Sequence, residues 1–393
     1  YSRNYSTSSY VVFGKVSGFD AVMDLSEIDG SNGFRLNGRG SVSTVGDVNG
    51  DGFDDVIIGS YVVFGKASGF DAGMDLSELD GSNGFRLNGG FIFNTAGDVN
   101  GDGFDDVIIG DFSAGFSSPG SHFSSGSSYV VFGKASGFDA VMDLSGLDGS
   151  NGFRLDGVAK RDGSGYSVSA AGDVNGDGFG DVIIGARLAG SSVVFGKASG
   201  FGAAMSLSTL NGSNGFHLDG GIRSVSNAGD VNGDGFDDVI VGVRGANPNG
   251  DFSGSSYVVF GKASGFDAIM NSSELDGSNG FHVDGLAAFD YLGASISAAG
   301  DVNGDGFDDV IVGAPGRFPG FIYGSSYVVF GKASGFDATV NLMPLDGVLK
   351  DGRLGSSVSG AGDVNGDGFD DLMVGAGGSV IFQGSDDLSY YTP

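Results

Sequence analysis

The 393-residue sequence contains no cysteine and no tryptophan, and it has only three histidines and six prolines. Without cysteine the chain can form no disulfide, thiolate metal site or cysteine nucleophile, although secreted proteins can also lack cysteine. No stretch approaches the roughly 20 apolar residues that a membrane-spanning helix needs. These absences exclude a disulfide scaffold and predict no helical insertion into a membrane.

Basic residues are scarce. Lys and Arg number 19 against 49 Asp and Glu, which gives a formal net charge of −30. A surface of this sign repels nucleic acid and anionic lipid and attracts inorganic cations. Glycine is abundant, with 78 residues, but it does not follow the three-residue period of collagen, and 33 Phe argue against disorder. The composition therefore indicates a folded protein whose simplest partners are cations.

An internal repeat runs through most of the chain. The string GDVNGDGFDD begins at Gly46, Gly97, Gly229, Gly300 and Gly362, and the variant GDVNGDGFGD begins at Gly172. The first aspartates of successive copies lie 51–75 residues apart. This spacing fits a four-stranded blade better than a helical solenoid, because long segments of 3.6-residue periodicity are absent.

Four short strands are predicted in each unit. The first is like residues 41–43 (SVS), the second like 56–59 (VIIG), the third like 61–66 (YVVFGK) and the fourth like 33–38 (GFRLNG). Glycine-rich and Asx-rich turns separate them, as an antiparallel meander requires. We predict an all-β fold, a β-propeller of four-stranded antiparallel blades. The alternative is an elongated β-solenoid, whose coils are usually shorter and more uniform.

We predict a single β-propeller domain over residues 1–393. Its full units are residues 39–88, 89–155, 156–219, 220–284 and 285–346, with partial units at 1–38 and 347–393. Residues 33–38 supply a fourth strand that the C-terminal unit lacks. We therefore predict six blades, closed by pairing residues 33–38 with residues 379–383, which leaves one YVVFGK-like strand unused. Seven blades are the alternative.

The acidic loop between the first and second strands is a candidate calcium site. In each copy positions 1, 5 and 9 are Asp, position 3 is Asn, position 6 is Gly, and position 7 is a Phe whose carbonyl is free. Converging oxygen donors suit calcium, which takes six to eight ligands, better than magnesium, which prefers a smaller octahedron with retained waters. An EF-hand would need Glu at position 12, where the first copy has Ile58, and flanking helices.

We predict about six calcium ions per chain. Acidic turns without metal are the alternative, but their carboxylates would repel one another. Position 8 is Asp in every copy except the third, which has Gly180; we expect this position to face solvent, so that the third site is retained. The predicted ligands are Asp47, Asn49, Asp51, Phe53 and Asp55; Asp98, Asn100, Asp102, Phe104 and Asp106; Asp173, Asn175, Asp177, Phe179 and Asp181; Asp230, Asn232, Asp234, Phe236 and Asp238; Asp301, Asn303, Asp305, Phe307 and Asp309; and Asp363, Asn365, Asp367, Phe369 and Asp371.

These motifs resemble the FG-GAP repeats of integrin α-subunit propellers and of their bacterial relatives. The resemblance rests on the D-x-N-x-D-G-x-x-D loop, on the Gly313-Ala314-Pro315 triplet and on the FG pair of YVVFGK. It implies calcium-binding hairpins on one face, ligands on the opposite face, and a secreted or cell-surface protein of bacterial type. Most copies lack the Ala-Pro of GAP, so the resemblance does not carry over the identity of a ligand.

The long irregular loops should lie on the face opposite the metal loops. Aromatic residues in variable loops on a regular scaffold are typical of recognition sites. The alternative is that each ring covers its own loop. The candidate ligand contacts are Phe112, Phe116, Phe123, Phe252, Phe318, Phe321 and Tyr323.

We predict an extracellular adhesion or ligand-binding module with structural calcium and a protein or glycan ligand. One alternative is a structural subunit of a surface layer, matrix or filament that self-assembles by strand addition. Another is a non-catalytic domain of a larger secreted hydrolase. We expect no enzymatic activity, because the only histidines are His122, His217 and His282, and no GxSxG elbow is present.

Overall fold

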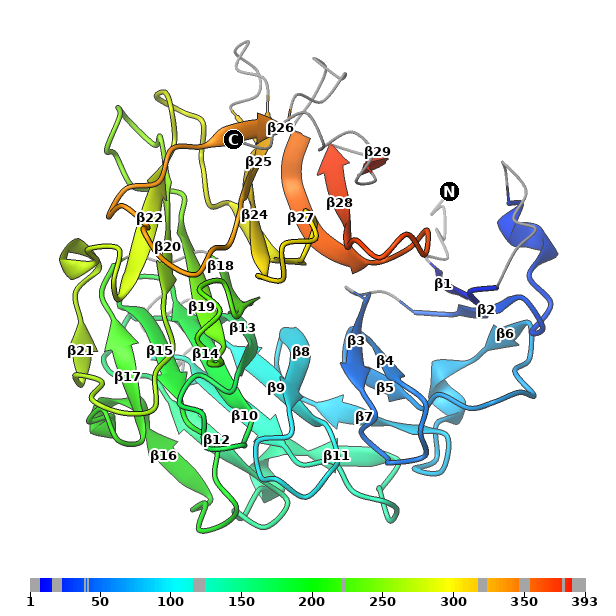
Figure 1. The fold of residues 1–393 in the computed structure, drawn as a ribbon. Helices are drawn as coiled ribbons and strands as arrows, with labels where there is room; N and C mark the ends of the chain where they lie inside the picture. The colour runs from blue at the N-terminus through cyan, green and yellow to red at the C-terminus, as the bar shows by residue number, and fades with distance from the viewer. Residues whose placement is uncertain are drawn as a thin grey trace, which may run out of the picture.

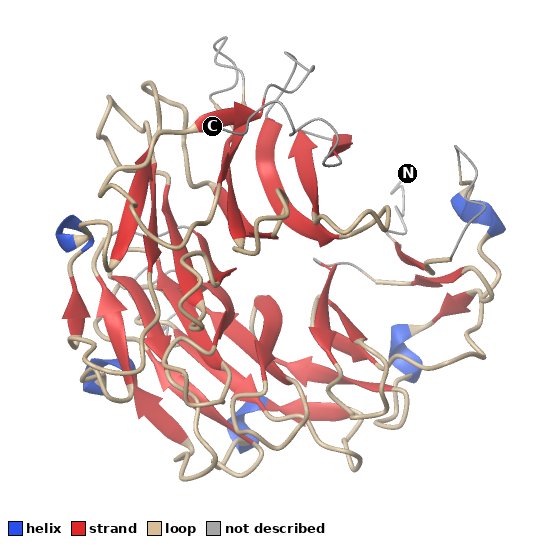
Figure 2. Ribbon diagram, in the orientation of Figure 1, coloured by secondary structure: helices blue, strands red, loops and turns tan. Residues whose placement is uncertain are grey.

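A computed structural model of the chain describes residues 8–15, 23–38, 40, 42–115, 124–220, 224–316, 324–345, 354–376 and 379–383. Within these ranges the regular structure is β-sheet, together with short 3₁₀ turns such as Leu25–Glu27 and Leu76–Glu78 (Figure 2). The sheets follow one another in sequence order around a common centre (Figure 1). No helix among these residues is long and apolar enough to cross a membrane.

The described strands form seven sheets. In chain order they are β1 (Ser9–Val12), β2 (Gly33–Leu36) and β6 (Gly73–Met74); β3 (Val42–Gly46), β4 (Asp55–Ile58), β5 (Tyr61–Val63), β7 (Gly84–Asn88) and β11 (Val141–Asp143); β8 (Ile92–Gly97), β9 (Asp106–Asp111), β10 (Ser127–Val131), β12 (Gly152–Asp156) and β16 (Ala204–Ser206); β13 (Ser164–Gly172), β14 (Asp181–Ala186), β15 (Gly190–Val194), β17 (Gly215–Leu218) and β21 (Ile269–Met270); β18 (Ser224–Gly229), β19 (Asp238–Val243), β20 (Ser255–Val259) and β22 (Gly280–Asp284); β23 (Ser295–Gly300), β24 (Asp309–Ala314), β25 (Ser325–Val329) and β26 (Met343–Leu345); and β27 (Leu354–Gly362), β28 (Asp371–Ala376) and β29 (Ser379–Gln383).

The four predicted strands of the repeat pair as an antiparallel meander. In the second sheet β4 lies between β3 and β5, and β5 pairs with β7. Most second strands are buried on both faces, and every residue of β14 is buried, which explains their continuous apolar sequence; β28 differs, with Met373 exposed. Side chains of adjacent sheets share cores: Ile57 of β4 and Val107 of β9 belong to one buried cluster. The predicted all-β propeller fold is confirmed.

A further strand, which the sequence analysis did not predict, joins neighbouring sheets. After its third strand the chain crosses to the preceding sheet and pairs in parallel with that sheet's fourth strand, as β11 does with β7 and β16 does with β12. The crossing segment also places Phe138 against Phe85, with ring centroids 4.8 Å apart and an interplanar angle of 4°. Each crossing therefore ties one blade to the blade before it.

The predicted pairing of residues 33–38 with residues 379–383 is wrong. Strand β2 pairs with β1 on one side and with β6 on the other, whereas β29 pairs with β28. The edge of β2 is taken by β1, the strand left unused in the six-blade prediction, because a partner close in sequence costs less chain entropy than one at the far end. The two ends of the described chain thus form separate sheets (Figure 1), and the six-blade count had depended on their sharing one.

Candidate metal loops and the opposite loop face

The six acidic loops connect the first and second strands of their sheets, as the loop between β3 and β4 does. They turn sharply because glycines take left-handed backbone conformations. In the first loop φ is +71° at Gly50 and +87° at Gly52, a region that is costly for other residues. A side chain at Gly50 would also collide with the ring of Phe104 from the next loop.

The side chains at positions 1, 3 and 5 turn toward the backbone of their own loop. In the first copy Asp47 accepts hydrogen bonds from the amides of Asp51 at 3.0 Å and Gly52 at 2.8 Å, and Asn49 accepts from the Asp51 amide at 2.9 Å. Asp51 in turn accepts from the amide of Phe53 at 3.0 Å. The other five loops repeat these bonds. Oxygen donors are thus gathered within one short turn.

The position-9 aspartate is buried at the base of each loop. Asp106 is 0% exposed, and its carboxylate accepts hydrogen bonds from the amides of Val99 and Gly133, both at 2.9 Å. Burial raises the pKa of Asp106 to about 8, and the nearby carboxylates of Asp102 and Asp98 add to the rise. The same causes raise the pKa of Asp55 to about 7. A nearby cation would favour the ionised form of such a group.

The FG pair after the third strand has a structural role beside the metal loop. Gly133 follows Phe132, and its amide is one of the two donors to Asp106. A side chain at Gly133 would meet the carbonyl oxygens of Asp105 and Val48, so glycine is required there. Equivalent amides of Gly65, Gly196, Gly261 and Gly331 hold the position-9 aspartates of four other loops.

Among the described residues, no group of three or more His, Cys, Asp or Glu side chains is close enough to hold a metal ion. The hydrogen bonds of the loops account for this, because positions 1, 3 and 5 face the loop amides while position 9 faces two buried amides. The donor set is nonetheless all oxygen, the kind that calcium prefers. The chemistry of the loops fits calcium.

The position-8 aspartates do not generally face solvent, which corrects the expectation from sequence. Among these aspartates only Asp54, in the first loop, is exposed to solvent as predicted. Asp105 accepts a hydrogen bond at 2.9 Å from the amide of Asp47 in the preceding loop. Asp237, Asp308 and Asp370 do the same for Asp173, Asp230 and Asp301, at 2.7, 2.8 and 2.9 Å. The sequence could not reveal these bonds because they join hairpins more than 50 residues apart.

The face opposite the acidic loops, which we call the loop face, is formed where the second strands end and the first strands begin. Of the seven predicted ligand contacts, Phe112 and Phe252 are described, and they are 37% and 47% exposed. The other five, Phe116, Phe123, Phe318, Phe321 and Tyr323, lie outside the described residues. The two described rings occupy different loops, and each belongs to a separate aromatic cluster.

The first cluster joins Phe112 to Phe91 and Tyr166, with ring centroids 5.3 and 5.8 Å away. Phe91 is 56% exposed, yet the sequence analysis did not select it. Its position in the sequence could have indicated its place, because Phe91 directly precedes a first strand and so lies in a connection on the loop face. Aromatic residues from two adjacent sheets therefore meet on the loop face.

The second cluster joins Phe252 to Phe289 and Tyr291, with ring centroids 6.2 and 5.7 Å away. All three residues have positive φ, at +54°, +68° and +57°, an unusual conformation for residues with bulky side chains. The guanidinium of Arg244 lies 5.4 Å from the centre of the Tyr291 ring. Strained backbone thus presents an aromatic and cationic group on the loop face.

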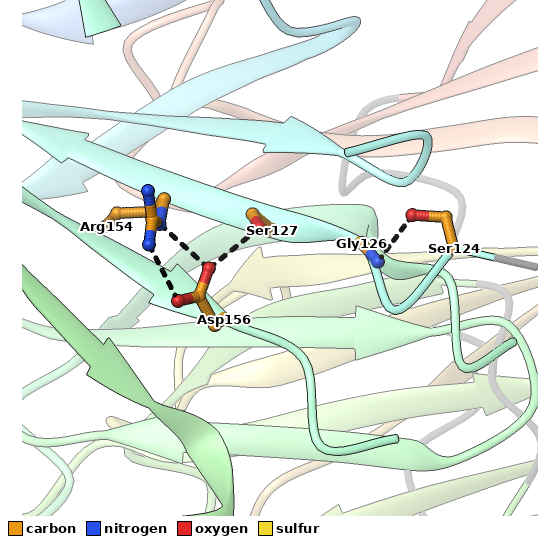
Figure 3. A network of polar contacts seen from close by, with 5 residues as sticks. All are labelled: Ser124, Gly126, Ser127, Arg154 and Asp156. Atoms are coloured by element: carbon orange, nitrogen blue, oxygen red, sulfur yellow. Dashed lines mark hydrogen bonds and ion pairs between the residues drawn. The ribbon is translucent and has the colours of Figure 1, made fainter. Parts of the chain in front are cut away.

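The bases of the long loops are fixed by polar contacts. Figure 3 shows Asp156 of β12 accepting two hydrogen bonds from Arg154, at 2.8 and 3.0 Å, and one from Ser127 of β10 at 3.0 Å. The amide of Gly126 donates to Ser124 at 3.0 Å. Ser255 and Asp284 form the same strand-to-strand bond at 2.7 Å. Rigid loop bases are what variable recognition loops require.

The two described histidines lie in fourth strands, at equivalent positions. Nδ1 of His217 is 2.9 Å from the Ser192 hydroxyl, and its Nε2 is 3.0 Å from the Leu207 carbonyl. Nε2 of His282 contacts the hydroxyl of Thr339 at 3.0 Å. These contacts belong to the sheets; His122 lies outside the described residues.

Comparison with known proteins identifies the repeat. The FG-GAP repeat family model matches residues 39–72, 164–203, 222–259, 292–329 and 354–388. Each matched segment contains one acidic loop, and the remaining loop, at 98–106, carries the same motif. The chain therefore carries FG-GAP repeats, which form a β-propeller fold.

Integrin α chains are among its relatives. The chain is 34% identical to integrin alpha-5 of Xenopus laevis over 122 residues, which cover 28% of this chain and 11% of the relative. It is 38% identical to integrin alpha-PS5 of Drosophila melanogaster over 140 residues, covering 34% and 13%. Identity to integrin alpha-V of Gallus gallus is 29% over 229 residues, covering 54% and 20%. The chain thus spans only a small part of the length of these relatives.

Proposed function

We infer that this protein is a secreted or cell-surface adhesion or ligand-binding module, in which the acidic loops bind structural calcium and the loop face binds a protein or glycan. The observation that carries this proposal is the sixfold recurrence of one all-oxygen donor set around a buried carboxylate. The integrin α relatives support it. Extracellular calcium is abundant enough to fill even weak sites of this kind.

Calcium would be held in the first loop by the side chains of Asp47, Asn49, Asp51 and Asp55 and by the Phe53 carbonyl, with the equivalent residues in the other five. When bound it would supply positive charge to carboxylates that otherwise repel one another. Six ions would contribute +12 against a net charge of −30. The ion has a structural role in this proposal, and the protein is not an enzyme.

Elemental analysis of the desalted protein tests the calcium sites. We expect about six calcium ions per chain. Replacing Asp51 by Asn should lower the number by about one, whereas replacing the exposed Asp54 by Asn should leave it unchanged. Two or fewer ions in the unmodified protein would contradict the proposal.

The loop face can be tested with an array of glycans and a panel of extracellular matrix proteins. We expect Phe252→Ala to weaken the binding of any probe that the unmodified protein retains, because Phe252 is 47% exposed within its cluster. Ile269→Ala, at a 60% exposed position on the outer strand β21, is the matched control. Equal binding by the two variants would reject the aromatic clusters as the contact surface.

A structural subunit is the second candidate. β1 pairs with β2 and β29 pairs with β28 at the two ends of the described sheets, and an unpaired strand edge can add a strand from another chain. Light scattering across a range of protein concentrations distinguishes the two. A concentration-dependent polymer would favour the structural role, and a constant monomer mass would favour the adhesion module.

A further inference from the structure

The metal loops contact one another in a continuous series. Each loop after the first places its position-7 Phe against the position-4 Gly of the loop before it, as Phe104 does with Gly50 and Phe179 with Gly101. At four of the five junctions, the lysine after the FG pair also donates its backbone amide to the position-2 carbonyl of that preceding loop, as Lys134 does to Val48 at 3.0 Å. These contacts recur whatever residue stands at position 8.

The position-8 carboxylate adds a bond that does depend on the residue. Asp105, Asp237, Asp308 and Asp370 each accept the amide of the first residue of the preceding loop. That residue's side chain is a proposed calcium ligand, so fixing its amide also fixes the start of the ligand set. A hydrogen bond to a charged acceptor is roughly twice as strong as a neutral one.

The series is interrupted once, between the second and third loops. Position 8 of the third loop is Gly180, which offers no carboxylate to the amide of Asp98. The backbones come closer there instead: the Gly180 amide lies 2.8 Å from the Asp98 carbonyl, against 3.1–3.3 Å at the four junctions that carry Asp. The Phe179 and Lys197 contacts are kept at this junction, so the carboxylate alone is missing.

We propose that the position-8 aspartate is a latch through which each metal loop orders the loop before it. Gly180 divides the six loops into a block of two, residues 47–55 and 98–106, and a block of four, from residue 173 to residue 371. The part of this proposal that concerns metal rests on the calcium function proposed above. Calcium should fill the loops of one block together and the two blocks separately.

The latch itself is tested without metal, by hydrogen exchange in excess chelator. Asp237→Gly removes one latch and no proposed ligand. We expect exchange of the Asp173 amide to become about tenfold faster, because a charge-assisted bond to that amide is lost. Asp54→Gly is the matched control: it changes the same position of the motif in the first loop, where the preceding sheet, β1-β2-β6, contributes no acidic loop. An unchanged exchange rate of the Asp173 amide in Asp237→Gly would overturn the latch, whether or not the protein binds calcium.

Gly180→Asp provides the converse test. A β-carbon at residue 180 would lie 3.2 Å from the nitrogen and the oxygen of Asp98, so the two loops must separate by a few tenths of an ångström, to the spacing of the other junctions. The variant should slow exchange of the Asp98 amide. If it does not fold, Asp105→Gly takes its place and should speed exchange of the Asp47 amide by about tenfold. No change at the probed amide would overturn the proposal.

The division into blocks is tested by following exchange of the loop peptides as free calcium is raised. In the unmodified protein the peptides from 173–181 onward should gain protection together, at a different calcium concentration from 47–55 and 98–106. Gly180→Asp should merge the two transitions. A single transition for all loops of the unmodified protein would overturn the division. If no calcium binds, the proposed function fails, but the chelator experiment still decides the latch.

Discussion

Phe138 is the residue whose replacement tests most directly how the blades are held together. It lies in the segment that crosses from one sheet to the preceding one, and it is 7% exposed. Its ring stacks on Phe85 at 4.8 Å, contacts Phe64 at 5.3 Å and lies 4.8 Å beneath the ammonium of Lys134. Truncating a buried Phe to Ala costs about 3–5 kcal/mol, of which the aromatic pairing supplies about 0.5–1.5 kcal/mol. We therefore expect Phe138→Ala to lower the free energy of unfolding by about 3–5 kcal/mol.

Denaturation in guanidinium followed by circular dichroism measures this loss, since the chain has no tryptophan to report by fluorescence. Phe138→Leu retains most of the volume and should cost less than about 1.5 kcal/mol. The matched control is Phe70→Ala in the crossing to the first sheet, where Phe70 stacks on Phe34 at 4.5 Å but is only half-buried; its loss should be clearly smaller. Equal losses for Phe138→Ala and Phe70→Ala would refute the view that burial between blades sets the energy.

Three further predictions concern the acidic loops and the chain ends. In chelator above pH 8, Asp106→Asn should raise the melting temperature, because it removes a buried charge. In calcium the same variant should lower the melting temperature, because it removes a ligand. A melting temperature that shifts in the same direction in both buffers would contradict the assignment of Asp106 as a calcium ligand. In chelator, the stability of the unmodified protein should fall as pH rises from about 4 to about 8. Burial raises the pKa of Asp106, Asp181 and Asp238 to about 8, so across that range the folded state holds protons that the unfolded state has released. Thermal melts at a series of pH values measure this fall in stability. Saturating calcium should abolish the fall. Deleting residues 1–38 removes β1 and β2, which pair only with each other and with β6 in the described structure. Because Phe34 and Leu36 of β2 share a buried cluster with Ile58 and Val63 of the second sheet, calorimetry should show the main unfolding transition preserved but at a lower temperature, and an unchanged transition would contradict this packing.

The strands and loops of each repeat were predictable because their signals are local. Apolar β-branched runs such as Val310–Val312 read as buried strands, and glycine at fixed positions of the acidic loop marks a turn of one shape. Six near-identical copies reinforced every assignment. The aromatic clusters of the loop face were harder to find, because Phe91 and Tyr291 contact rings from neighbouring loops that lie far apart in the sequence.

The chain by itself determined an all-β propeller of FG-GAP repeats, the position of each acidic loop and the oxygen-rich donor sets, because all of these depend on residues within about ten positions of one another. Only the tertiary structure decided what joins one repeat to the next. The parallel crossing of β11 onto β7, the bond from Asp105 to the Asp47 amide and the pairing of β2 with β1 all depend on which surfaces meet when the sheets pack. Identical repeats carry the same local signals at every junction. Those signals cannot reveal which partner each edge takes, nor that the single change at Gly180 removes a contact to another loop.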